Sequence, residues 1–194
     1  MRELALLTFV TLDGVMQSPG SPDEDPSIGF TLGGWAQPCW DEVMEQVREE
    51  AMAEPYDLLL GRKTYESFAA SFAGSDARDP TAQKLNSAAK LVVTSRSEEL
   101  TWRGSERVGG DLPTAVTRLK AQRGPLLQVH GSWQLAQALI ADDLVDEFRL
   151  WVFPVVVGSG KRLFESGTVA RRLELVRTRS TSNGAVMTIY RRQR

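Results

Sequence analysis

The sequence contains a single cysteine, Cys39, and a single histidine, His130, and this scarcity excludes several kinds of chemistry. One cysteine cannot form an intramolecular disulfide, which is typical of proteins from a reducing compartment. A zinc site built from cysteine and histidine needs more ligands than these two residues supply, so we expect no metal centre. A Cys–His nucleophilic pair stays formally open, but Cys39 next to Pro38 and Trp40 is more typical of a packed, small apolar side chain.

Long apolar runs and a strong net charge are also missing. No apolar stretch approaches the roughly 20 residues that a membrane-spanning helix needs, and no signal-peptide pattern opens the sequence. The formal net charge is −2, so no basic field favours nucleic acid or an anionic membrane. With 194 residues, 42% of them hydrophobic, the sequence predicts one domain over residues 1–194 in the cytoplasm.

The familiar nucleotide-binding motifs are absent. No G-x-G-x-x-G follows the first expected strand. The segment 158–161, Gly-Ser-Gly-Lys, resembles part of a P-loop, but Val155 replaces the first glycine and Arg162 replaces the required Ser or Thr. We interpret it as a glycine turn after an apolar strand, which argues against a nucleotide-dependent transferase.

What the sequence does contain is an alternation of strand and helix patterns. Strands are expected at residues 3–10, 57–60, 90–93 and 125–130, and helices at residues 39–53, 63–72, 113–122 and 133–141. This alternation implies parallel pairing. A β-rich run at 145–157 and two strands, 171–180 and 185–192, around the hairpin signal Asn183-Gly184 follow. The predicted class is α/β, with a mixed, mostly parallel sheet, helices on both faces and a C-terminal antiparallel hairpin.

Three of the expected strands end in turns of small, hydroxyl or cationic residues: 61–64 (Gly-Arg-Lys-Thr), 94–96 (Thr-Ser-Arg) and 131–132 (Gly-Ser). Cations in the first turn of a helix are disfavoured by its dipole. Either these side chains extend into solvent from ordinary capped helices, or an anion binds at the turns. Ligands of open α/β sheets bind outside the carboxyl ends of the strands. The pattern predicts a ligand with several phosphates, and the hydroxyls and guanidinium at 94–96 favour NADP over NAD.

The order of these segments resembles the dihydrofolate reductase superfamily, and more closely its branch related to the reductase domain of the bacterial riboflavin-biosynthesis deaminase/reductase. The resemblance rests on residues 11–15, 60–66, 92–96, 129–132, 144–148 and 153–164. It implies a three-layer dihydrofolate-reductase-like fold and NADPH lying across the three turns. Dihydrofolate reductases carry a glycine pair at the third turn, whereas this chain has Gly131-Ser132, which weakens the case for folate.

The resemblance also implies roles for individual residues. The implied cofactor contacts are Gly61, Arg62 and Thr64 for the phosphates and ribose, Thr94, Ser95 and Arg96 for the 2′-phosphate, and Gly131, Ser132, Trp133 and Leu135 for the pyrophosphate and nicotinamide. Arg62 is expected to face the phosphates. Lys63, about 100° further round the helix, is expected to point elsewhere.

The expected chemistry is hydride transfer to a polarised C=N or C=O together with delivery of a proton. Asp41 and Glu45, one helical turn apart, and Asp13 at the opening turn are candidate proton donors. The same run of carboxylates is also typical of a solvated helix face.

Substrate contacts are expected at Gly14, Trp35, Phe153 and Gly158. Among the tryptophans, Trp35 is favoured because glycines precede it, whereas Trp40, Trp133 and Trp151 are more typical of a core. His130 is expected to be a hydrogen-bonded structural residue.

Together these features predict an NADPH-dependent reductase of a small pterin- or pyrimidine-like heterocycle. It would be similar to dihydrofolate reductase or to 5-amino-6-(5-phosphoribosylamino)uracil reductase. The alternative is an NADP(H)-binding module without catalytic turnover. A homodimer is expected because the C-terminal strands leave an apolar edge, as the resemblance also implies.

Overall fold

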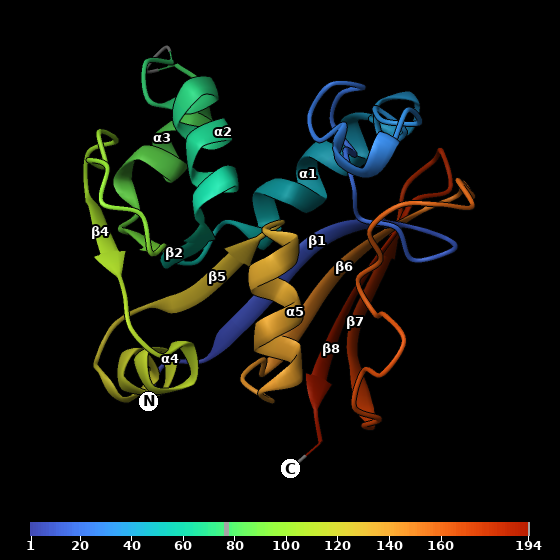
Figure 1. Cartoon of the computed structure of the whole chain (residues 1–194). Helices are drawn as coiled ribbons and strands as arrows, with labels where there is room; N and C mark the ends of the chain where they lie inside the picture. Colours follow the sequence, from blue (N-terminus) through green and yellow to red (C-terminus); the bar gives the residue numbers. More distant parts are fainter. Residues whose placement is uncertain (76–77, 194) are drawn as a thin grey trace.

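The computed structural model describes residues 1–75 and 78–193 and contains one eight-stranded sheet (Figure 1). The strands are β1 Leu4–Thr11, β2 Tyr56–Gly61, β3 Lys90–Val93, β4 Ser105–Val108, β5 Leu126–His130, β6 Glu147–Phe153, β7 Leu173–Ser180 and β8 Val186–Arg192. Their spatial order is β4-β3-β2-β5-β1-β6-β8-β7. The pairs from β4 to β6 are parallel, and β8 is antiparallel to both of its neighbours. The predicted fold class is confirmed.

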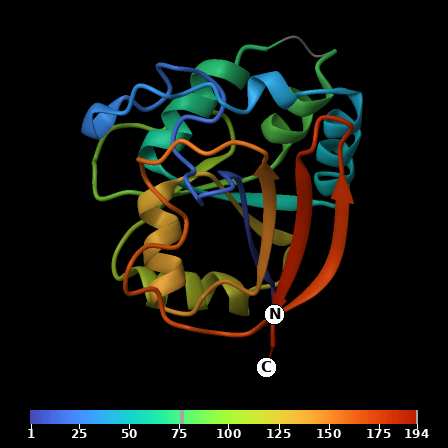
Figure 2. The same cartoon turned by 90° about the vertical axis from the view of Figure 1, so that its right-hand side faces the viewer.

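Helices cover both faces of the sheet (Figure 2). They are α1 Glu42–Ala51, α2 Arg62–Phe72, α3 Pro80–Ser87, α4 Leu112–Ala121 and α5 Trp133–Ala141. Leu4 and Leu6 of β1 pack in the core with α4 and α5, whereas Leu7 packs in a second core with α1. Successive strand residues face opposite sides, so the coverage of both faces explains why seven of the eight residues of β1 are buried.

Because β1 to β6 pair in parallel, their carboxyl ends lie at one edge of the sheet. In Figure 1 strands β1, β5 and β6 run upward to this edge, and both chain termini lie at the bottom. Residues 12–41 and 154–172 contain no strand of the sheet and only two short 3-10 turns, Ser27–Gly29 and Gln37–Cys39. The first of these segments leaves the carboxyl end of β1, and the second leaves that of β6. No helix among the described residues combines the length and the apolar character that a bilayer crossing requires.

Two boundaries differ by more than two residues from the sequence-based expectation, and one strand was not predicted. Helix α1 begins at Glu42 rather than at residue 39, because Asp41 caps it. Strand β6 ends at Phe153 rather than at residue 157, because Pro154 has no N–H for the ladder. Strand β4 was not predicted: it is a four-residue edge strand whose Glu106 and Arg107 are exposed, so it lacks the apolar pattern of a buried strand.

Candidate functional site

The turns that follow β2, β3 and β5 form one continuous surface. The Gly61 N–H donates a hydrogen bond to Ser132 Oγ at 3.0 Å, which joins the first turn to the third. The Arg62 guanidinium donates to the carbonyl oxygen of Glu98 at 3.2 Å, which joins the first turn to the segment after β3. The structure therefore brings together the three turns that the sequence singled out.

The helices that begin at this surface differ from the others in how their N-termini are capped. Helices α1, α3 and α4 each begin with an aspartate, Asp41, Asp79 or Asp111, whose carboxylate accepts first-turn N–H groups. Helices α2 and α5 follow Gly61 and Ser132, and within the described part of the chain neither has a side-chain cap or an acidic residue in its first turn. Two positive helix ends thus meet at one place without a compensating carboxylate, which is the arrangement that binds anions.

The third turn has an unusual backbone. Gly131 and Ser132 both have φ of 55°, a region that a serine rarely adopts. The Ser132 hydroxyl accepts from Gly61 and donates to the His130 carbonyl at 3.3 Å. No described atom outside the adjoining residues lies within 4 Å of the position that a Cβ on Gly131 would take, so the turn faces open space. Trp133 is partly buried beside it, and Leu135 is buried in the core.

The cationic side chains of the first two turns are arranged in different ways. Arg62 pairs with Glu66 at 2.6 Å and reaches the second turn through Glu98, while Lys63 is exposed. Thr64 and Thr94 are partly buried, and the Thr94 hydroxyl accepts from the Arg96 N–H at 3.1 Å. Ser95 and Arg96 are exposed at the second turn, where they are accessible to an anionic group.

Two of the three candidate proton donors are held as carboxylates. The pKa of Asp13 is lowered, chiefly by a hydrogen bond from the Thr11 hydroxyl at 2.6 Å, with further bonds from the Gly158 and Val157 N–H groups. The pKa of Asp41 is lowered by the Ser182 hydroxyl and by the Met44 N–H that it caps. A proton donor at neutral pH needs the opposite shift, so this geometry disfavours both residues in that role.

Glu45 has a different environment from the other two carboxylates. It pairs with Arg48 one turn later in α1, and it accepts the indole N–H of Trp40 at 3.0 Å. The Arg48 guanidinium also lies 5.7 Å from the Trp40 ring centroid. Glu45 is therefore the candidate carboxylate that lies against an exposed aromatic ring.

Trp35 and Trp40 have the opposite environments to those expected from the sequence. Trp35 is only 7% exposed and donates its indole N–H to the Gln17 carbonyl at 2.8 Å, and Phe153, which it contacts edge to face, is fully buried. Both belong to the core cluster that packs against α1, and this burial argues against a substrate contact. Trp40, expected in the core, is 39% exposed and lies 5.8 Å from the Phe9 ring. The contact between Phe9 and Trp40 could not be predicted from the sequence, because Phe9 lies in β1 and Trp40 lies just before α1. A periodic pattern relates residues within one element and does not relate two different elements.

The remaining substrate candidates are Gly14, which follows Asp13 in the chain, and Gly158, which contacts the Asp13 side chain. The Gly14 carbonyl accepts from the Leu163 N–H at 2.9 Å, and the Gly158 N–H donates to the Asp13 carboxylate at 2.9 Å. The opening turn and the glycine turn, which are far apart in the sequence, are therefore packed together.

His130 is hydrogen-bonded and buried, as predicted. Its Nε2 lies 2.8 Å from Gln128 Oε1, and its ring stacks on Tyr56 at 5.9 Å. Burial lowers the pKa of His130 to about 4, and the nearby Arg149 acts in the same direction. The imidazole is neutral at physiological pH and does not supply a proton.

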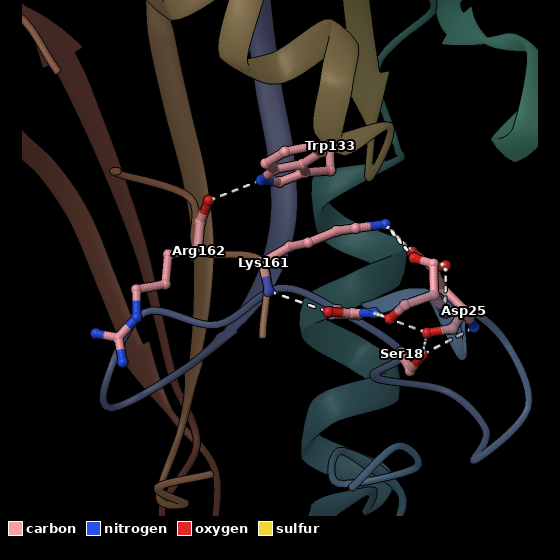
Figure 3. A network of polar contacts seen from close by, with 7 residues as sticks. Ser18, Asp25, Trp133, Lys161 and Arg162 are labelled. Carbon is pink, nitrogen blue, oxygen red and sulfur yellow. Dashed lines mark hydrogen bonds and ion pairs between the residues drawn. The ribbon is translucent and has the colours of Figure 1, made fainter. Parts of the chain in front are cut away.

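A polar network that sequence reasoning missed fastens the long segment after β1 to the glycine turn (Figure 3). The Lys161 ammonium contacts the Asp25 carboxylate at 2.5 Å and the Ser27 hydroxyl at 2.7 Å. The Lys161 N–H donates to Gln17 Oε1 at 3.0 Å, and the ammonium lies 5.4 Å from the Trp133 ring centroid. Lys161 thus connects three segments at the carboxyl edge: the loop after β1, the glycine turn and the start of α5.

Comparisons with known proteins agree with this architecture. Two uncharacterized proteins of Bacillus subtilis (strain 168) are similar: YyaP is 28% identical over 97% of this chain and 94% of its own, and YwjB is 25% identical over 92% and 91%. A proposed riboflavin biosynthesis protein from Shewanella sp. PV-4 superposes with a TM-score of 0.67 at 18% identity, with both chains fully covered.

A pyrimidine reductase-like protein from Corynebacterium diphtheriae superposes with a TM-score of 0.60 at 12% identity, over all of this chain and 92% of that one. At such identities the two structures establish the fold. The sequence profile of the RibD C-terminal domain matches residues 2–187. The chain therefore belongs to the RibD C-terminal domain family.

Proposed function

We propose that this protein is an NADPH-dependent reductase of a small heterocyclic substrate of the pterin or pyrimidine kind. The observation that carries the proposal is the meeting of two uncapped helix N-termini, α2 and α5, through the Gly61–Ser132 hydrogen bond. A pyrophosphate would satisfy the first-turn N–H groups of both helices at once. Family membership and the pyrimidine reductase-like structural neighbour support the reaction class.

The residues present fit the cofactor. Gly61, Thr64, Gly131 and Ser132 would hold its phosphates, and Arg62 would lie between these and the second turn. Ser95 and Arg96, both exposed beside Thr94, would hold the 2′-phosphate. When bound, NADPH would supply the hydride.

The chain's own residues would orient the substrate and deliver the proton. Phe9 and Trp40, with rings 5.8 Å apart, offer a planar ligand an aromatic surface beside Glu45. Because the pKa values of Asp13 and Asp41 are lowered and Glu45 lies beside this aromatic surface, we assign the proton delivery to Glu45.

Isothermal titration with NADPH and with NADH tests the cofactor assignment. Saturable binding that is tighter for NADPH supports it, and a lack of binding of either at millimolar concentration would overturn it. NADPH oxidation across a panel of pterins, folates and ribosylaminopyrimidines then tests the reaction.

A second candidate is an NADP(H)-binding module without turnover. The lowered pKa values of Asp13 and Asp41 favour it, because they remove two of the three proton donors. In that case NADPH should bind saturably, and no substrate of the panel should oxidise it. Turnover of any one substrate excludes the binding-module alternative.

A further inference from the structure

An apolar cavity of about 260 Å³ lies between the end of α5, the start of β6 and the segment 164–173. In Figure 1 this is the lower end of α5, beside the orange segment, and the three turns lie at the opposite end of the same helix. The cavity is thus separate from the candidate active site, and a ligand could occupy it whether or not the protein is a reductase.

The lining of the cavity is apolar and incompletely covered. Leu139, Val145 and Phe148 are buried at its base, and Phe148 packs against Phe164 with ring centroids 5.7 Å apart. Phe164 is 45% exposed and Val169 is 53% exposed. A ligand that removed this apolar surface from water would gain free energy from doing so.

The mouth of the cavity is cationic. A second, more open hollow of about 560 Å³ shares Val169, Ala170 and Arg171 with the first and adds Arg172, Arg192 and Asp143. Arg171 and Arg192 both pair with Asp143. Arg172 is exposed, and its guanidinium contacts no partner within residues 1–75 and 78–193. Two of the three arginines thus share one carboxylate and the third is unpaired among the described residues, so the lining of the second hollow carries a net positive charge.

We propose that this is a binding site for a small amphiphilic anion, with its apolar body in the cavity and its anionic head at Arg172. The volume sets the size of the body. It exceeds the ~150 Å³ of a cavity that takes benzene and falls just below the ~300 Å³ at which pockets for drug-sized ligands begin. An eight-carbon chain or a bicyclic ring is the appropriate size.

Charge favours an anion as the occupant. The second hollow is lined by three arginines, Arg171, Arg172 and Arg192, and by one carboxylate, that of Asp143. A small molecule with an anionic head group has the charge that is complementary to this excess.

Calorimetric titration of the full chain with octanoate, and separately with octanol, tests the proposal. We expect one saturable octanoate site that NADPH does not displace, and weaker binding of the uncharged octanol. No saturable octanoate binding would overturn the proposal, as would displacement by NADPH or an equal affinity for octanol.

Two variants with a matched control locate the site. Ala170→Trp, at an exposed position that lines both hollows, should abolish octanoate binding. Arg172→Glu should weaken it by at least about threefold, in the range of exposed charge interactions, and Arg123→Glu, an exposed arginine elsewhere, should not. Equal effects of the two arginine variants, or octanoate-induced dissociation of a dimer in light scattering, would contradict the assignment. Circular dichroism establishes whether each variant is folded. If Ala170→Trp is unfolded, the result for Arg172→Glu decides the test.

Discussion

Gly61 and Ser132, 71 positions apart in the sequence, are joined by one hydrogen bond from the Gly61 N–H to the Ser132 Oγ at 3.0 Å. The bond fixes the N-terminus of α2 against that of α5. It also explains why Ser132 does not cap its own helix, since its hydroxyl is used by the neighbouring turn.

Substitution of Ser132 separates the role of the hydroxyl from that of the backbone. Ser132→Ala loses the bond and keeps the positive φ, so we expect a loss of about 1 kcal/mol in unfolding free energy and weaker NADPH binding. Ser132→Gly loses the same bond but relieves roughly 1 kcal/mol of backbone strain, so its stability should stay near that of the parent. Urea denaturation and NADPH titration measure both. Equal stabilities of the two variants would show that the backbone is unstrained.

Arg96 is the exposed cation of the second turn, and it should discriminate between the two nicotinamide cofactors. Arg96→Ala should weaken NADPH binding by about tenfold or more, since a hydrogen bond to a charged group contributes roughly 1.5–3 kcal/mol, and should leave NADH binding unchanged. Titration with both cofactors measures the difference, and Arg123→Ala serves as a control. Equal losses for NADPH and NADH would contradict the 2′-phosphate assignment.

Lys161 and Asp25 should be coupled energetically. Lys161→Met and Asp25→Asn each break the contact between the loop after β1 and the glycine turn. The double variant should therefore be less destabilised than the sum of the single variants, by about 1 kcal/mol. Denaturation of the four proteins gives this coupling energy, and limited proteolysis should cleave residues 17–40 faster in each variant. Additive losses would show that the contact contributes nothing to stability.

Asp13 should make stability depend on acid pH. Its folded pKa lies below the ordinary value of 3.8 because the Thr11 hydroxyl and two N–H groups bond to the charged form. The stabilisation is therefore fully present above pH 3.8 and is lost as the pH falls through the folded pKa. Urea denaturation between pH 5 and pH 2 should give a shallower decrease for Asp13→Asn than for the parent. Parallel curves for the two proteins would exclude this contribution.

The outer strand of the sheet offers a surface for self-association, and we propose that the protein is a homodimer. Strand β7 has one strand neighbour, and Leu175 and Val176 on it are 51% and 50% exposed. Light scattering should give twice the chain mass, and Val176→Lys should give a monomer. Val156→Lys, at a 66% exposed valine outside β7, should not change the mass. A monomeric parent protein would refute the proposal.

The periodic elements were predictable because local chemistry specifies them. The strand 90–93 and the helix 133–141 match β3 and α5 residue for residue, since buried parallel strands and apolar helices are marked by composition alone. Edge strand β4 was missed because it has four residues, and the two in its middle, Glu106 and Arg107, are charged and exposed. The helix predicted from residue 39 begins only at Glu42, because Cys39 ends a 3-10 turn and Asp41 caps α1.

The sequence by itself determined the order of the elements, the mixed sheet and the three turns that meet at its carboxyl edge, because parallel strands necessarily end on the same side. Only the tertiary structure decided how individual side chains are used. Asp41 caps α1, Trp35 is buried in the core and Trp40 is exposed. Lys161 pairs with Asp25, which lies 136 positions earlier in the chain. These outcomes depend on which distant groups satisfy each hydrogen bond and charge, and no local pattern in the chain encodes that.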